Sequence, residues 1–127
     1  IANERIKAGE SVFFAHVPEL LDHLRYAFSS DSESAPDRLF QEIKDCPLLV
    51  MDDLGRERGS PWTAEKLYQI LVHRHNRRLA TIITTSTDFE KDEVSGTASR
   101  IQDPSVGEII KIEAKDFRRG GMRRRVV

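Results

Sequence analysis

The segment 48–55, LLVMDDLG, constrains the fold more than any other part of this chain. Four apolar residues run directly into the adjacent carboxylates Asp52 and Asp53, and a leucine and Gly55 follow. An uninterrupted apolar run of this kind is typical of a strand buried on both faces of a parallel α/β sheet. Side chains at the carboxyl end of such a strand lie where α/β sheets bind their ligands. The segment therefore predicts an α/β fold with a ligand site beside the two aspartates.

The two aspartates have two possible roles. Desolvating adjacent carboxylates costs free energy unless a ligand uses them. A common user is a magnesium ion bound to nucleotide phosphates, and the pattern then corresponds to a Walker B motif. In that interpretation Asp52 holds Mg²⁺, and Asp53 orients or deprotonates the attacking water. The alternative is a buried strand followed by a helix that Asp53 caps, and the segment by itself does not separate the two.

Length and composition restrict the class of protein. A chain of 127 residues forms one domain at most and is long enough for a core, and 39% hydrophobic with 32% charged residues is ordinary for a soluble globular protein. No apolar run approaches the length of a membrane span. The single cysteine, Cys46, excludes an internal disulfide. We therefore expect a cytoplasmic protein.

The rest of the sequence alternates between strand and helix patterns. Alternating elements of this kind predict a parallel sheet covered by helices. Gly9 ends a first short helix, and Ser60 followed by proline is a typical helix start. We predict strands at 11–17, 48–52, 80–86 and 108–112, and helices ending at 9 and covering 18–28, 37–45, 61–78 and part of 91–101.

With its strands, helices and motifs in this order and spacing, the chain resembles the AAA+ ATPase domain of DnaC-type helicase loaders and of the related IstB transposition helpers. The resemblance covers almost the whole chain and implies a three-layer α/β/α P-loop NTPase core with a parallel sheet of strand order 5-1-4-3-2. It is carried by IANERIKAGESVFF (1–14), VPELLDHLRYAF (17–28), LLVMDDLG (48–55), SPWTAEKLYQILVHRHNRR (60–78), LATIITTS (79–86), SRI (99–101) and KDFRR (115–119).

The resemblance implies a role for five residues. Asp52 is the metal and nucleotide ligand, and Asp53 stands where many AAA+ proteins have glutamate. Ser86 ends the strand that resembles sensor 1, where asparagine is more usual. Arg100 resembles the arginine finger that reaches a neighbouring subunit's γ-phosphate, and Arg118 resembles a sensor 2 arginine. The shorter reach of Asp53 and the weaker hydrogen bonding of Ser86 predict slow hydrolysis.

A phosphate-binding loop is missing from the pattern. The sequence contains no G-x-x-x-x-G-K-[ST] motif. We expect this Walker A loop and the first strand to precede Ile1 in a longer parent protein, so that 1–127 is a partial AAA+ domain. The parent would be an ATPase, and this piece alone would be inactive. Residues 116–127 form a basic tail, with five arginines and one aspartate, which is either a solvated terminus or a phosphate-contacting arm.

The resemblance also implies cofactors and partners. ATP and Mg²⁺ would lie between the subunits of a homo-oligomer that binds single-stranded DNA and a replicative helicase during DNA replication. The helix at 19–28 carries His23, Arg25 and Tyr26 on its polar side, a combination that suits single-stranded DNA, although a helix that merely covers the sheet explains it equally well. The alternatives are an IstB-like helper that acts with a transposase, and a hydrolysis-deficient scaffold.

One expectation concerns the edge of the sheet. If strand 1 is missing, the strand at 80–86 pairs with 48–52 on one side only. The strand at 108–112 then either lies beyond a vacant slot or moves inward to pair with 80–86. Pairing of 48–52 with 108–112 would contradict the AAA+ topology.

Overall fold

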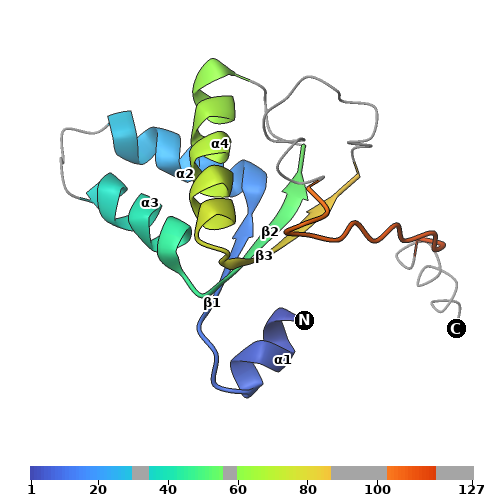
Figure 1. The fold of residues 1–127 in the computed structure, drawn as a ribbon. Coiled ribbons are helices and arrows are strands. Elements are labelled where there is room, and N and C mark those ends of the chain that lie inside the picture. The colour runs from blue at the N-terminus through green and yellow to red at the C-terminus, as the bar shows by residue number, and fades with distance from the viewer. Residues whose placement is uncertain (30–34, 56–59, 87–102, 117–127) are drawn as a thin grey trace, which may run out of the picture.

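The computed structural model describes residues 1–29, 35–55, 60–86 and 103–116. Helices and strands alternate along most of this part of the chain, as the sequence predicts (Figure 1). None of the helices in these ranges is long and apolar enough to cross a membrane. The elements are α1 (Ala2–Lys7), β1 (Val12–His16), α2 (Val17–Ser29), α3 (Ala35–Asp45), β2 (Leu48–Leu54), α4 (Pro61–Asn76) and β3 (Ala80–Thr85).

The sheet is parallel and has the order β1-β2-β3. Val12 pairs with Leu48 at one end of β1, and His16 pairs with Asp52 at the other. On the other side of β2, Met51 pairs with Ile83 of β3. The central position of β2 explains its continuous apolar run, because both of its edges are paired and both of its faces are buried.

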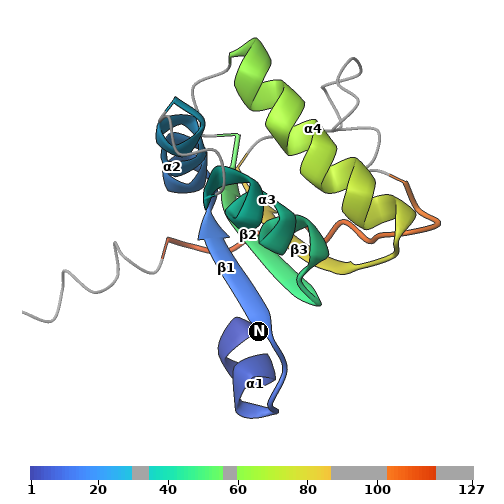
Figure 2. The same cartoon turned by 90° about the vertical axis from the view of Figure 1, so that its left-hand side faces the viewer.

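Helices α2, α3 and α4 cover one face of this sheet (Figures 1 and 2). Strand residues on that face alternate with those on the opposite face, where Phe14 is 58% exposed. The core between helices and sheet is made mainly of aliphatic side chains. It contains Ala15, Leu49 and Met51 from the strands, Leu20, Leu21 and Leu24 from α2, Phe40 and Ile43 from α3, and Leu67, Ile70 and Leu71 from α4.

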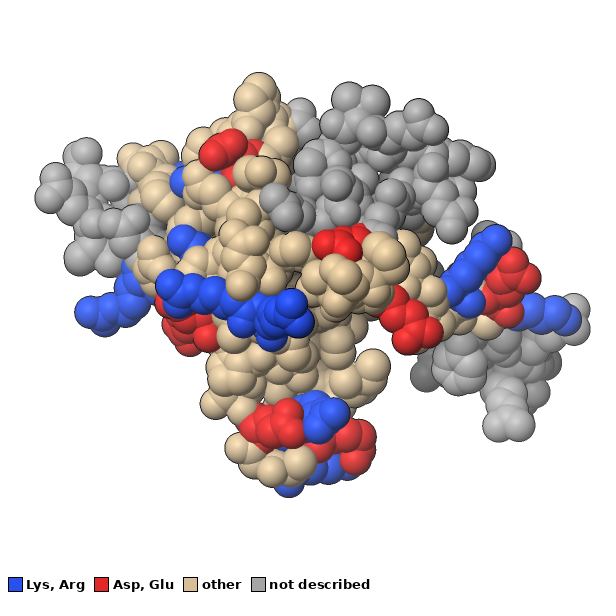
Figure 3. Space-filling view, viewed as in Figure 1, with Lys and Arg blue, Asp and Glu red and all other residues tan. Residues whose placement is uncertain are grey.

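Helix α1 lies apart from this core and has no buried residue. It ends before Gly9, whose φ of +84° suits glycine, so the predicted helix end is confirmed. Figure 3 shows acidic and basic side chains mixed at this end of the molecule. Two ion pairs form here. Arg5 Nη1 lies 2.9 Å from Glu10 Oε1, and Lys7 Nζ lies 3.1 Å from Glu4 Oε1. Exposed pairs of this kind contribute little to stability.

A buried arginine joins the helical layer to the sheet. Arg74 of α4 is only 1% exposed, and burial lowers the pKa of its guanidinium. Backbone carbonyls and one hydroxyl accept its hydrogen bonds. Nη1 donates to the carbonyls of Ile43 (3.1 Å), Lys44 (3.1 Å) and Cys46 (2.8 Å), Nη2 to that of Ala80 (2.7 Å), and Nε to Thr81 Oγ1 (2.8 Å). One side chain thus connects α4 with the end of α3 and the approaches to β2 and β3.

The predicted strand at 108–112 is wrong. Residues 107–116 form no strand, and Ile109, Ile110 and Ile112 are 54%, 73% and 83% exposed. A strand needs a neighbour that satisfies its backbone groups. In the implied topology that neighbour is strand 1, and the described residues contain no such strand. Among the described residues β3 pairs with β2 alone, so 108–112 has not moved inward. The predicted helix within 91–101 lies outside the described residues.

We predict that Arg74→Met destabilises the fold strongly. The substitution keeps most of the apolar stem but leaves buried carbonyls without a donor, and each such loss costs about 1–3 kcal/mol. The free energy of unfolding in urea should therefore fall by about 3 kcal/mol or more. Arg77→Met is the matched control, because Arg77 is largely exposed and its contact with Asp45 is 3.6 Å long. Equal urea midpoints for the two variants would contradict the role of Arg74.

Candidate nucleotide and metal site

The carboxyl ends of the three strands meet at one edge of the sheet. Parallel strands bring these ends together, and α/β sheets bind ligands there. The last residue of β1, His16, lies in register with Asp52 of β2. Near the end of β3, Thr84 contacts the same aspartate. The edge therefore gathers polar side chains that lie far apart in the sequence.

A threonine hydroxyl fixes the position of Asp52. Thr84 Oγ1 donates a hydrogen bond of 2.6 Å to Asp52 Oδ1, and the backbone N–H of Asp53 donates to the same hydroxyl at 3.0 Å. Both interactions join β2 to β3 between the pairs Met51–Ile83 and Leu54–Thr85, where the regular register is interrupted. Asp52 Oδ2 has no hydrogen-bond partner in the part of the chain that the structure describes. One oxygen of Asp52 is thus held in place and the other is available to a ligand.

The backbone changes direction immediately after Asp52. The register between β2 and β3 shifts between Met51 and Leu54, and Asp53 has a φ of +64°. A positive φ is uncommon for a residue other than glycine, and aspartate is among the more tolerant ones. The side chain of Asp53 is 41% exposed. The irregularity lets two consecutive carboxylates belong to the same site, which strand alternation alone would prevent.

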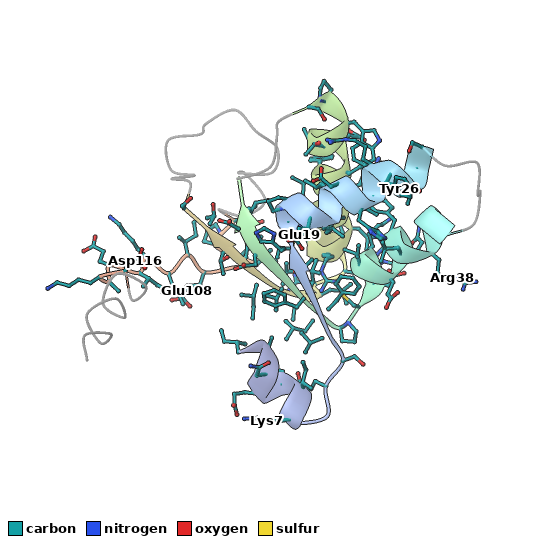
Figure 4. All side chains as sticks on the ribbon, turned by 180° about the vertical axis from the view of Figure 1, so that it is seen from behind. Lys7, Glu19, Tyr26, Arg38, Glu108 and Asp116 are labelled. Atoms are coloured by element: carbon teal, nitrogen blue, oxygen red, sulfur yellow. The ribbon has the colours of Figure 1, made fainter. Side chains whose placement is uncertain are left out.

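His16 lies between two carboxylates. Its Nε2 is 3.5 Å from Asp53 Oδ2, and its Nδ1 is 3.8 Å from Glu19 Oε1 on the first turn of α2. Figure 4 shows Glu19 where β1 gives way to α2. His16 Nδ1 is buried without a hydrogen-bond partner among the described residues. A protonated imidazole here would pair with Asp53 and set the direction of its carboxylate.

The structure brings only some of the predicted site residues together. Asp52 and Asp53 occupy the predicted edge. Ser86 follows β3 directly and is exposed. Thr84, two residues earlier, contacts Asp52, and the sequence did not predict this contact. Arg100 and Arg118 lie outside the described residues, so their predicted roles stay predictions.

Sequence reasoning missed His16 and Thr84. His16 is the second-last residue of the predicted strand 11–17 and the last residue of β1, and a polar residue near the end of a parallel strand was a usable signal. Thr84 lies within TIITTS (81–86), where the sequence does not indicate which hydroxyl faces β2. That choice depends on the register of β3 against β2, which only the structure gives.

The donor set fits magnesium that arrives with a nucleotide. Within residues 1–29, 35–55, 60–86 and 103–116 no group of three or more histidine, cysteine or acidic residues could hold a metal ion by itself. Mg²⁺ in phosphate-transfer sites is usually held by one or two carboxylates, and phosphate and water complete its coordination. Asp52, with one oxygen fixed and one available, provides this kind of partial site.

The fold and this edge define a class of protein. The parallel sheet with its covering helices, together with the likeness to solved structures, places the chain in the α/β class of the P-loop NTPase core of the AAA+ type. Residues 1–106 match the profile of the IstB_IS21 family, described as IstB-like ATP binding protein. The chain belongs to this family.

Two similar proteins are named as replicative helicase loaders. The chain is 28% identical over 95 residues to the replicative helicase loader DnaI of Bacillus subtilis (strain 168), covering 74% of this chain and 29% of that protein. It is 24% identical over 89 residues to the replicative helicase loader DnaC of Buchnera aphidicola subsp. Baizongia pistaciae (strain Bp), covering 70% of this chain and 36% of that protein. It therefore spans about a third of the length of these relatives.

Two solved structures have the same fold. The crystal structure of the DnaC helicase loader aligns with a TM-score of 0.56 and 28% identity, covering 76% of this chain and 52% of that one. The crystal structure of DnaI aligns with a TM-score of 0.61 and 29% identity, covering 78% of this chain and 55% of that one.

We predict that Thr84 matters more to the site than Ser86. Thr84→Val removes the hydroxyl that holds Asp52 but keeps the shape of the side chain. If the longer protein is the ATPase that we propose below, its Mg²⁺-dependent ATP turnover should fall by about tenfold or more, while Thr84→Ser keeps most of it. Ser86→Ala is the matched variant at the end of the same strand. A larger loss for Ser86→Ala than for Thr84→Val would contradict this role of Thr84.

Proposed function

We propose that this chain is part of the ATPase module of a replicative helicase loader, where it binds ATP and Mg²⁺ between subunits. The observation that carries the proposal is Asp52, held at the ligand edge by Thr84 with Asp53 beside it. The named relatives are replicative helicase loaders, which supports the proposed role in helicase loading. The chain covers only part of each relative, so the activity belongs to the longer parent protein.

In this proposal each residue has a defined task in ATP hydrolysis. Bound Mg²⁺ would neutralise charge on the phosphates, and Asp52 would hold the ion through its available oxygen. Asp53 would orient a water for attack on the γ-phosphorus and accept its proton, with His16 directing the carboxylate. Thr84 keeps Asp52 in place, and Ser86 would lie near the water. Aspartate reaches less far than glutamate, which favours slow turnover.

Two arginines would complete the site. Arg100 would reach the γ-phosphate bound by a neighbouring subunit, and so would couple hydrolysis to assembly of the homo-oligomer. Arg118 would contact the nucleotide bound by its own subunit. The arginines that follow it (119, 123, 124 and 125) would contact phosphate groups of nucleic acid. These roles derive from the resemblance of SRI (99–101) and KDFRR (115–119) to the family pattern.

A cationic and aromatic surface on α2 and α4 suits single-stranded DNA. Arg25 lies 5.7 Å from the ring centre of Trp62 and donates to Thr63 Oγ1 at 3.1 Å. Lys66 Nζ lies 4.5 Å from the ring centre of Phe28. Tyr26 is 76% exposed and projects from α2 (Figure 4). Cations that already lie over Trp62 and Phe28 leave Tyr26 as the ring for base stacking.

A second candidate keeps the ATP site and changes the partner. The family profile is that of IstB-like proteins, which favours a helper that acts on DNA with a transposase. Capture of a replicative helicase or of a transposase by the full-length parent separates these two. A third candidate is an ATP-dependent scaffold that does not hydrolyse, for which the short side chain of Asp53 is the supporting feature. ATP turnover measured with and without single-stranded DNA decides that one.

We predict different effects for the two aspartates in the full-length parent. Asp52→Ala should abolish Mg²⁺-dependent ATP turnover, because the metal loses its protein ligand. Asp53→Ala should keep nucleotide binding and lower turnover by about a hundredfold or more. Asp22→Ala on the exposed side of α2 is the control, and its turnover should equal that of the wild type. Equal turnover for wild type and both site variants would exclude the Walker B interpretation.

We also predict that Tyr26→Ala weakens binding of single-stranded DNA. A stacking ring contributes about 1–3 kcal/mol per base, so the Kd for an oligothymidine should rise roughly 5- to 100-fold in fluorescence anisotropy. Tyr68→Ala is the control, because Tyr68 is also exposed (39%) but lies about 200° around α4 from Lys66. An unchanged Kd for Tyr26→Ala would leave α2 as a helix that only covers the sheet.

A further inference from the structure

One side of strand β1 is open. In the described part of the chain β1 lies at the edge of the sheet and pairs with β2 alone. The outer side of an edge strand presents N–H and C=O groups that pair readily with another strand. Proline, lysine or a bulge usually blocks such an edge, but β1 has the sequence VFFAH and a regular register against β2. The open side of β1 is therefore able to accept a further strand.

A groove of about 300 Å³ lies at β1. Residues of β1, α2 and α3 line it, namely Phe13, Phe14, Ala15, His16, Glu19, Leu20, His23 and Leu39. Phe13 and Leu39 are only partly buried against the core, so both keep apolar surface that a partner can cover. Phe14, which alternates with Phe13 along the strand, is 58% exposed. Apolar surface is thus available on both faces of β1.

The chain also carries a segment with the composition of a strand and no neighbour. Residues 108–113, EIIKIE, form no strand, and their three isoleucines are between 54% and 83% exposed. Lys111 Nζ lies 3.2 Å from Glu113 Oε1, and side chains two residues apart share a face when the backbone is extended. Figure 4 shows Glu108 and Asp116 on a segment that projects away from the sheet. The segment is therefore apolar, uncovered and already suited to pairing.

We propose that segment 108–113 of one copy of this chain adds as a strand to the open side of β1 in a second copy. In an extended segment Ile110 and Ile112 share one face. They would enter the groove and cover Phe13 and Leu39. In contacts of this kind the main-chain hydrogen bonds give affinity, and pockets for alternate side chains give specificity. Each surface provides what the other lacks among the described residues.

The second face of the added strand is also complementary. Ile109 alternates with Ile110 and is 54% exposed. Strands that pair in one sheet share its two faces, so Ile109 would lie on the side of Phe14 when Ile110 lies on the side of Phe13. Burial of these side chains removes apolar surface of both copies from water, which favours association.

The contact joins two different surfaces of the same chain. It is therefore heterologous, and it yields rings or filaments unless two copies exchange their segments reciprocally. It uses neither Asp52 nor Asp53, so it is independent of the proposed ATP site. In a longer parent the implied strand 1 would compete for 108–112, so the test uses the chain of 127 residues.

Sedimentation velocity at increasing protein concentration measures the association. The wild-type chain should associate, and Ile110→Asp combined with Ile112→Asp should raise the Kd of association about tenfold or more. Phe14→Lys should do the same from the other surface, because a lysine on an edge strand opposes pairing. Ile1→Asp is the matched control, since Ile1 is 78% exposed and lies outside both surfaces, and it should associate like the wild type.

A mixture of the two monomeric variants gives the sharpest result. Phe14→Lys keeps the segment and loses the acceptor edge, whereas the double isoleucine variant keeps the edge and loses the segment. Equal amounts should form a one-to-one dimer and nothing larger, which also shows that both variants are folded. The proposal is overturned by a wild-type chain that stays monomeric at about 0.1 mM, by association that survives either variant, or by a mixture that stays monomeric.

Discussion

The guanidinium of Arg74 is the interaction on which the arrangement of the chain depends. It is nearly inaccessible to solvent, and its hydrogen bonds end on α3, on the loop before β2 and at the start of β3. A buried cation is costly unless its donors are all used. Here the amino ends of two neighbouring strands are fixed against one helix, and the register of β2 against β3 is set from that end.

The site at the other end of the strands follows from this register. Once β3 is aligned with β2, Thr84 meets Asp52, and once β1 is aligned with β2, His16 meets Asp53. The shift between Met51 and Leu54 then turns the second carboxylate toward the same edge. The carboxyl end of α4, fastened by the same arginine, also gives Asp103 a fixed contact through His75. Stability at one end of the sheet thus supports the geometry proposed for function at the other.

Most of the fold could be predicted from the sequence, because the apolar run of β2 and the alternation of elements depend on local patterns. The position of Asp52 and Asp53 followed from the same run. Thr84 and His16 could not be identified as partners of these aspartates, because a partner depends on strand register. The segment 108–112 has the composition of a strand, yet it forms none, since a strand requires a neighbour as well as a pattern. The roles of Arg100 and Arg118 stay predictions.

The central claim is that Asp52 holds the metal of a bound nucleotide, and the most direct measurement locates that metal. The full-length parent would be crystallised with a non-hydrolysable ATP analogue and Mn²⁺ in place of Mg²⁺, and anomalous scattering would give the position of the ion. We expect one manganese peak within about 2–2.5 Å of Asp52 Oδ2, or joined to it by one water, with the Thr84–Asp52 hydrogen bond intact. Bound nucleotide with the manganese away from Asp52 would contradict the account.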